Sequence, residues 1–198
     1  MKERVMRWVF ALTACASIAA VILICVFLFA NGVPAMAEIG FFNFVGGQRW
    51  KPSSGLYGIW PMIVGSLYVT AGALIVGVPA GIFTAMYLAR FCNKRLYRFL
   101  KPAINLLAGI PSVVYGFFGL VVLVPLVREW LGGTGMSTLT ASVLLGIMIL
   151  PTIIGVAESA IRAVPEAYYE GALALGATHE RSVFFVVLRA ARSGVLAG

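Results

Sequence analysis

The side chains that could carry out covalent or metal chemistry are few and scattered in this sequence. Among 198 residues there are three cysteines, one histidine and no aspartate, and no two cysteines form a Cys-x-x-Cys pair. A metal site needs several such ligands close together. The stretch at Thr134-Gly135 also lacks the Gly-Lys-Ser/Thr ending of a phosphate-binding loop. We therefore expect no metal, no cofactor and no catalytic residue.

A polar run in the second half of the chain has instead the features of a short docking helix. The run Glu-Gly-Ala-Leu-Ala-Leu-Gly occupies residues 170–176. Upstream of it, Pro165 suits the first turn of a helix, and Glu166 suits the positive end of the helix dipole. Gly176 suits the left-handed residue that ends a helix. The pattern predicts a helix of about three turns between Pro165 and Gly176.

One face of this helix carries almost no side chains, because Ala167, Gly171 and Ala174 follow one another at helical spacing. Another backbone or a groove could approach that face closely, with Tyr168 and Leu175 beside it as anchors. The alternative is a connecting helix whose small residues serve only helix packing in a bilayer. On the docking interpretation, the residues that contact a partner are Tyr168, Glu170, Gly171, Ala172, Leu175 and Gly176.

A second feature is an interruption in an apolar run, where residues 109–112 read Gly-Ile-Pro-Ser. Proline cannot complete an intrahelical hydrogen bond. At membrane depth, broken backbone is tolerated only where it is buried in protein or lines a wet cavity. The interruption therefore indicates either a solute path or a simple proline kink. On the first interpretation, the residues on the path are Gly109, Pro111, Ser112 and Tyr115.

The composition indicates the kind of fold that positions these two features. The chain is 61% apolar and 11% charged, with a mean hydropathy of +0.99, whereas a soluble domain has roughly twice that charged fraction. We predict an all-α polytopic membrane protein, forming one membrane domain over residues 1–198. Four complete spans and the start of a fifth are expected, with the docking helix between spans four and five. The predicted spans are 8–30, 62–89, 103–127, 137–157 and 183–198.

The first apolar run has a competing interpretation. Residues 35–37 read Ala-Met-Ala, which has the small-x-small form of a signal-peptide cleavage site. The run from Trp8 to Ala30 is longer than the apolar core of a usual signal peptide. We therefore favour a membrane span over a cleaved leader.

The distribution of basic residues predicts an orientation. Residues 90–101 carry five basic side chains and no acid, and basic loops stay on the cytoplasmic side of a membrane. With both termini inside, only Arg49, Lys51 and Arg128 of the 15 basic residues face outside. Nucleic acid is the other partner that a net charge of +8 could indicate. A juxtamembrane cluster near lipid head groups already accounts for the charge, so we expect membrane lipid and no nucleic acid.

The polar run resembles the EAA motif of ABC-transporter permeases, which reads Glu-Ala-Ala, three residues, Gly, nine residues, Ile-x-Leu-Pro. Gly171 replaces the second motif residue, a small change. Arg189 replaces the proline. The matching positions are Glu170, Ala172, Gly176 and Leu188, with Val186 in place of isoleucine.

A longer resemblance runs from about Trp50 to the C-terminal end. The run Leu-Leu-Ala-Gly-Ile-Pro-Ser-Val-Val-Tyr-Gly at residues 106–116 is similar to the phosphate-specific ABC permeases, the PstC kind in particular. The resemblance implies a multi-pass subunit of a bacterial or archaeal inner membrane, with its N-terminus in the cytoplasm. It implies three kinds of partner: a second related permease, dimeric cytoplasmic ATP-binding subunits and an extracytoplasmic phosphate-binding protein.

The resemblance also implies a mechanical function, in which partner subunits hydrolyse ATP and the permease itself is no enzyme. It implies further spans, so we expect the sequence to be incomplete at its C-terminal end. The family's Gly-Arg-x-x-Gly-Glu setting in the next span has no match here. Two other functions are open: a permease for molybdate, sulfate or an amino acid, and a membrane scaffold that transports nothing.

Overall fold

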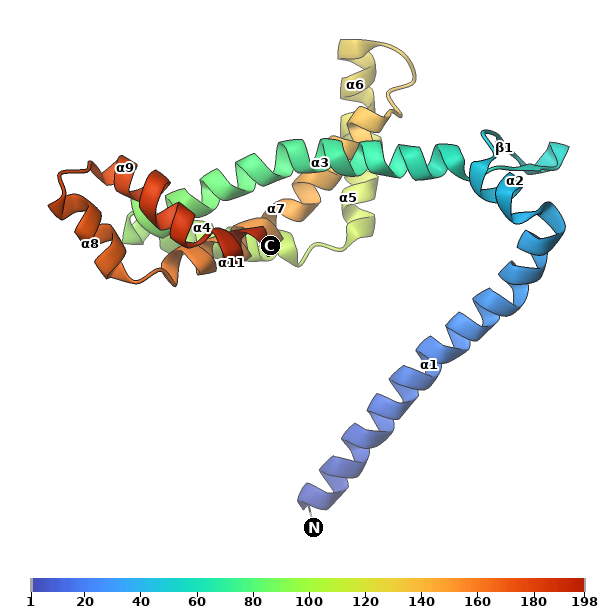
Figure 1. Cartoon of the computed structure of the whole chain (residues 1–198), viewed down its shortest axis with the longest axis horizontal. Coiled ribbons are helices and arrows are strands. Elements are labelled where there is room, and N and C mark those ends of the chain that lie inside the picture. The colour runs from blue at the N-terminus through green and yellow to red at the C-terminus, as the bar shows by residue number, and fades with distance from the viewer. Residues whose placement is uncertain (1, 198) are drawn as a thin grey trace. The chain divides into compact units, whose positions relative to one another are not determined.

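The computed structural model describes residues 2–197, almost all of them helical (Figure 1). The chain divides into two compact units, residues 1–64 and residues 65–198. The predicted all-α fold is confirmed. Among the described residues, four helices are long and apolar enough to cross a membrane: Glu3–Ile39, Trp60–Phe91, Ser112–Leu131 and Thr138–Arg162.

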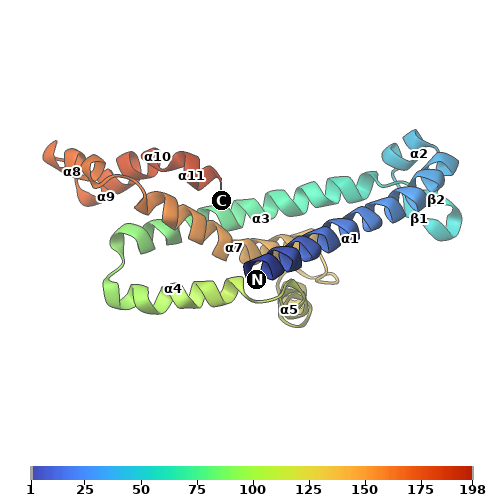
Figure 2. The ribbon, with the colours of Figure 1, turned by 90° about the horizontal axis from the view of Figure 1, so that it is seen from below.

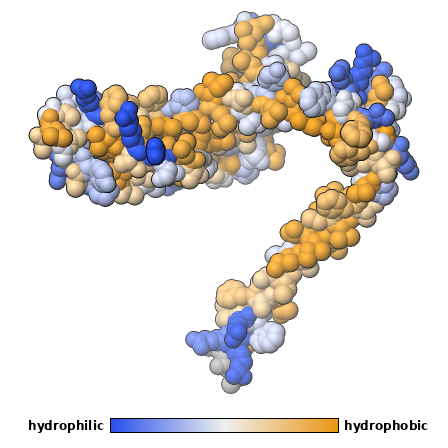
Figure 3. Space-filling model, viewed as in Figure 1, coloured by the Kyte–Doolittle hydropathy of each residue, from blue (hydrophilic) through white to orange (hydrophobic). Residues whose placement is uncertain are grey.

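The first unit is a long helix followed by a small hairpin. Helix α1 runs over Lys2–Ile39, beyond the predicted span 8–30, and passes through Pro34 without ending. Its apolar residues, orange in Figure 3, cover most of its length, and hydrophilic residues gather at its N-terminal end. The unit then contains the short helix α2 and an antiparallel pair of strands. Their bounds are α2 Phe41–Gly46, β1 Trp50–Lys51, η1 Pro52–Ser54 and β2 Leu56–Tyr57.

The second unit is built on two long helices, α3 and α7, joined by shorter ones. Helix α3 begins at Trp60 in the first unit and continues across the boundary between Val64 and Gly65. A π-helical turn, η2, follows α3 directly and ends at Phe91. The bounds are α3 Trp60–Met86, η2 Tyr87–Phe91, α4 Lys94–Ala108, α5 Ser112–Phe118, η3 Gly119–Leu123, α6 Val124–Leu131, α7 Thr138–Arg162, α8 Glu166–Ala174, α9 His179–Ser182, η4 Val183–Val187, α10 Leu188–Ala190 and α11 Arg192–Leu196.

The region predicted as span 103–127 is two separate helical pieces. Helix α4 begins at Lys94, because the Asn93 side chain accepts a hydrogen bond from the Leu96 backbone N–H at 2.7 Å and caps it. The helix ends at Ala108, ahead of Pro111. The continuous apolar helix therefore starts at Ser112 rather than at residue 103. The membrane boundaries of this span stay a prediction.

Small residues let α3 and α7 approach closely. A Cβ atom added at Gly77 would lie 3.1 Å from the Gly146 carbonyl oxygen, and one added at Gly81 would lie 2.6 Å from Cγ2 of Ile153. Close approach of this kind is how helices pack in bilayers, where the solvent is as apolar as the side chains. Figure 2 shows α7 between α3 and α4.

The core lies where the C-terminal ends of α3 and α7 meet the end of the chain. The C-terminal segment η4–α11, within predicted span 183–198, packs against α7. A Cβ at Gly194 would lie 2.6 Å from that of Ala160. The core residues are all 7% exposed or less: Ala85, Met86, Ala157, Ile161, Val164, Val187 and Ala191. This core fixes the position from which α8 extends.

Candidate functional site

Helix α8 is the predicted docking helix, and its ends follow from local sequence. Pro165 is the residue immediately before the helix, in an extended conformation. At the other end Gly176 has φ +83°, the left-handed conformation predicted for it. Its N–H donates to the Leu173 carbonyl at 2.9 Å, and the Ala177 N–H donates to the Ala172 carbonyl at 3.1 Å. These two bonds form a Schellman motif, so the helix stop is confirmed.

The small-residue face of α8 is open. Ala167, Gly171 and Ala174 are all exposed, and a Cβ added at Gly171 would meet no atom within 4 Å. The flanking Tyr168 and Leu175 are 56% and 91% exposed. Large exposed apolar side chains beside a bare backbone face form a surface that another protein could cover.

An ion pair joins α8 to the turn η2 at the end of α3, and the neighbouring α9 contacts the same turn. Arg90 Nη1 lies 2.7 Å from Glu166 Oε2. The Tyr169 hydroxyl and His179 Nδ1 are 2.7 Å apart, and the His179 ring packs edge-on against Phe91 with centroids 4.6 Å apart. These contacts join α8 and α9 to the end of α3. The sequence analysis missed these contacts, although Arg90 is the first charge after a long uncharged run.

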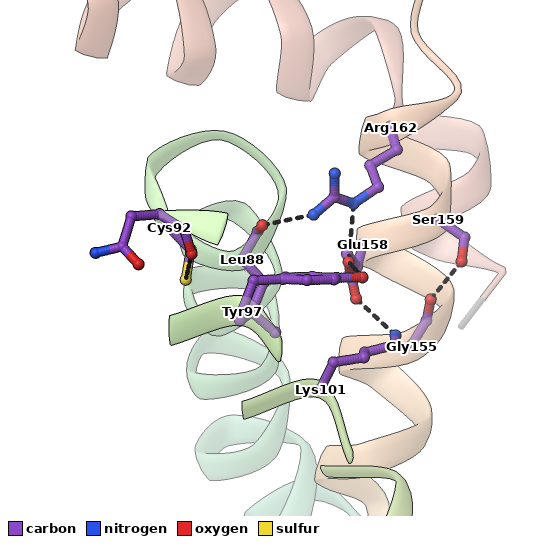
Figure 4. Close-up of polar contacts among 9 residues, drawn as sticks. Leu88, Cys92, Tyr97, Lys101, Gly155, Glu158, Ser159 and Arg162 are labelled. Carbon is purple, nitrogen blue, oxygen red and sulfur yellow. Dashed lines mark hydrogen bonds and ion pairs between the residues drawn. The ribbon is translucent and has the colours of Figure 1, made fainter. Parts of the chain in front are cut away.

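A second polar cluster, drawn in Figure 4, joins α4, α7 and η2 around Glu158. Glu158 is 2% exposed. Its carboxylate accepts hydrogen bonds from Lys101 Nζ at 2.6 Å, from Arg162 Nε at 2.8 Å and from the Tyr97 hydroxyl at 2.8 Å. Arg162 Nη2 also donates to the Leu88 carbonyl at 2.8 Å. Both carboxylate oxygens are thus occupied, as a buried charge requires.

Within this cluster Tyr97 acts as a donor. Its hydrogen bond to Glu158 raises the pKa of the Tyr97 hydroxyl, because losing the proton would place a second negative charge beside the carboxylate. The Arg162 guanidinium lies 4.7 Å from the centre of the Tyr97 ring. The sequence analysis also missed Glu158. The available signal was the Glu158–Arg162 spacing of four residues at the end of a span.

The four residues predicted on a solute path lie at the break between α4 and α5. Gly109 caps α4 and Pro111 precedes α5. The Tyr115 hydroxyl donates to the Leu107 carbonyl at 2.9 Å, and the same carbonyl accepts from the Ile110 N–H at 3.2 Å. Tyr115 is buried, whereas Ser112 is exposed. The Tyr115 hydroxyl therefore stabilises the break between the two helices, whereas the Ser112 side chain is exposed.

These helices define a multi-pass α-helical membrane protein, and comparison with known families narrows the class. The model for the binding-protein-dependent transport system inner membrane component matches residues 77–198, more than half of the chain. The protein belongs to this family of permeases.

Individual relatives agree with the resemblance noted in the sequence. The probable ABC transporter permease protein YqgH of Bacillus subtilis is 39% identical over 186 residues, covering 90% of this chain and 60% of the relative. The phosphate transport system permease protein PstC of Mesorhizobium japonicum is 32% identical over 191 residues, covering 86% and 58%. A probable PstC of Methanocaldococcus jannaschii is 30% identical over 198 residues, covering 89% and 62%. The resemblance to PstC-type permeases is confirmed, and the chain spans about three fifths of these relatives' length.

One solved structure has a similar fold. A chain from inward-facing conformations of the MetNI methionine ABC transporter aligns with a TM-score of 0.53 and 26% sequence identity. The alignment covers 71% of this chain and 63% of that chain.

Proposed function

We propose that this protein is a membrane-spanning permease subunit of an ATP-driven phosphate importer. The observation that carries the proposal is the 30–33% identity to PstC permeases over most of the chain. The Ile-Pro-Ser-Val-Val-Tyr-Gly run at residues 110–116 agrees with it. The protein itself hydrolyses no ATP in this proposal.

In the proposed mechanism, α8 is the point at which a cytoplasmic ATPase acts on the permease. A groove of the ATPase receives its exposed small-residue face, and Tyr168 and Leu175 anchor the contact. When the ATPase dimer closes, α8 moves as a rigid body. The ion pair between Arg90 and Glu166, together with the contact of His179 with Phe91, then transmits the movement to the end of α3. The Glu158 cluster keeps α4 and α7 moving together.

The break at residues 109–112 is proposed to lie on the solute path. An anion within a membrane needs N–H or O–H donors or cations, because transfer into hydrocarbon is costly. Ser112 is exposed and lies at the N-terminal end of α5, where its hydroxyl can donate a hydrogen bond. This hydroxyl could face an oxyanion, while Tyr115 holds the break in shape.

The partners proposed are a second related permease, dimeric cytoplasmic ATP-binding subunits and an extracytoplasmic phosphate-binding protein. The N-terminus, the segment 90–101 and α8 are proposed to face the cytoplasm of a bacterial or archaeal cell. The bias of basic residues toward these segments supports this orientation.

The orientation predicts a labelling pattern in intact cells. With the native Cys15, Cys25 and Cys92 replaced by serine, a cysteine at exposed Arg95 or Ala174 should resist a membrane-impermeant maleimide until the membrane is opened. A cysteine at exposed Lys51 should react at once and serves as the control. Immediate labelling at Arg95 or Ala174 would contradict the orientation.

A second candidate function is import of an amino acid, favoured by the fold shared with the methionine transporter chain. The PstC relatives at up to 33% identity make phosphate the stronger proposal. Molybdate and sulfate permeases and a non-transporting scaffold remain as rivals that transport measurements can distinguish.

Transport by the polypeptide that carries this chain tests the function directly. Expressed in a host lacking its own phosphate permease of this type, together with the proposed partners, it should restore ATP-dependent uptake of ³²P-labelled phosphate. Unlabelled phosphate should compete, whereas sulfate, molybdate and methionine should not. Competition by one of those three would identify a rival substrate, and no uptake of any would favour the scaffold.

A further inference from the structure

A basic pocket lies beside the Glu158 cluster, at the point where α3, α4 and α7 converge. Its volume is about 630 Å³, and it is bounded by the end of η2, the first half of α4 and the end of α7. Six polar side chains face it: Arg90, Lys94, Tyr97, Arg98, Lys101 and Arg162. Five of the six are cations, contributed by segments up to 72 residues apart in sequence (Arg90 to Arg162), so the fold has assembled them.

The carboxylates that touch these cations do not balance their charge. Glu158 pairs with Lys101 and Arg162, and Glu166 pairs with Arg90. Within the described part of the chain, Lys94 and Arg98 form no ion pair. Five positive charges thus meet two negative ones, and the sequence has no acidic residue between Glu38 and Glu129. The pocket keeps an excess of positive charge.

Arg90 adds an unsatisfied donor to this excess. Its side chain is only 13% exposed. Its Nε atom is buried and has no hydrogen-bond partner among the described residues. A buried donor without a partner costs free energy, and guanidinium groups match the oxygens of phosphate closely.

The pocket lies where two apolar helices end. The candidate membrane helices Trp60–Phe91 and Thr138–Arg162 both end in residues of its wall or next to it. On the outside of α4, Phe99 is 75% exposed and Leu96 is 37% exposed. Apolar side chains beside a cationic cluster are typical of a protein surface at the level of lipid head groups.

We propose that this pocket binds a phosphate-bearing anion, either the head group of an anionic phospholipid at the membrane surface or free inorganic phosphate. Lys94 and Arg98 supply the unpaired cations, and Arg90 adds a largely buried guanidinium charge. Binding there would tie α4 to the ends of α3 and α7, beside the attachment of α8. The proposal concerns a site separate from the break at residues 109–112, and it does not depend on which solute is transported.

The test uses the purified chain in lipid nanodiscs, with three variants of α4. Lys94→Gln and Arg98→Gln each remove one cation from the pocket, whereas Arg95→Gln removes the same charge from an exposed position outside the lining. Electron paramagnetic resonance of spin-labelled phosphatidylglycerol and phosphatidylcholine gives the preference for the anionic lipid. Equilibrium dialysis of ³²P-labelled inorganic phosphate, in nanodiscs of phosphatidylcholine alone, gives binding of the free ion.

Lys94→Gln and Arg98→Gln should each lower one of these two quantities about five-fold, with Arg95→Gln changing it by less than about two-fold. A loss of phosphatidylglycerol preference identifies the lipid source, and a loss of phosphate binding identifies the free ion. Equal effects of all three variants would show that the charge acts diffusely and would overturn the pocket. Unchanged binding in both assays would also overturn the pocket. This holds even if Lys94→Gln and Arg98→Gln weaken co-purification of the ATPase.

Discussion

Replacing Glu158 by alanine should lower the free energy of unfolding by about 3 kcal/mol, the low end of what breaking a buried ion pair costs. The change removes the acceptor for Lys101, Arg162 and Tyr97 at once. The low end applies because the Lys101 and Arg162 side chains are 27% and 45% exposed, so water can solvate part of each freed charge. Thermal or denaturant unfolding of the purified chain in detergent measures the difference.

The matched control for this change is Glu170→Ala. Glu170 is an exposed glutamate on α8 and forms no ion pair with a described residue, so its removal should change stability by no more than about 0.5 kcal/mol. Glu158→Gln should fall between the two, because an amide still accepts a hydrogen bond but loses the charge. If Glu158→Ala and Glu170→Ala unfold alike, the cluster does not hold α4 against α7.

The contacts of the Glu158 cluster could not be predicted from the sequence. Lys101 and Tyr97 lie 57 and 61 residues from Glu158, and Arg90 lies 76 residues from Glu166. Hydropathy and helical spacing report on neighbours a few residues apart, so they cannot pair groups at such separations. Only the spacing of Glu158 and Arg162, four residues apart, was visible locally.

What the sequence did predict depends on local chemistry. The left-handed Gly176 follows from glycine's lack of a Cβ, and the long apolar helices follow from composition. The start of α4 at Lys94 was not predicted, because hydropathy marks only the apolar second half of this helix, from residue 103. The signal that decides it is the Asn93 cap, a single side chain whose hydrogen bond to Leu96 sets the helix start. Hydropathy averaged over a span cannot register one cap.

Gly171→Leu should uncouple ATP hydrolysis from transport while leaving the chain folded and inserted. A Cβ atom added at residue 171 would have no atom within 4 Å, so a leucine there extends into the space that a docking partner would fill. Overpacking a close interface costs about 1–3 kcal/mol, which corresponds to roughly a five-fold to hundred-fold loss of affinity. Co-purification of the ATPase with the permease, followed by uptake in vesicles, measures both steps.

Gly176→Leu should also uncouple ATP hydrolysis from transport, but by weakening the end of α8. Gly176 has φ +83°, and a residue with a Cβ pays about 1–2 kcal/mol to adopt that conformation. The Schellman stop of α8 would loosen, so this variant should also lower protection of the α8 amide protons against hydrogen exchange. Gly171→Leu should leave that protection unchanged, since its site is open.

Glu180→Gln, on the neighbouring α9, should bind the ATPase and transport like the parent. If Gly171→Leu and Gly176→Leu also behave like the parent in both assays, α8 is only a connecting helix, and ATP hydrolysis must reach the permease through another surface.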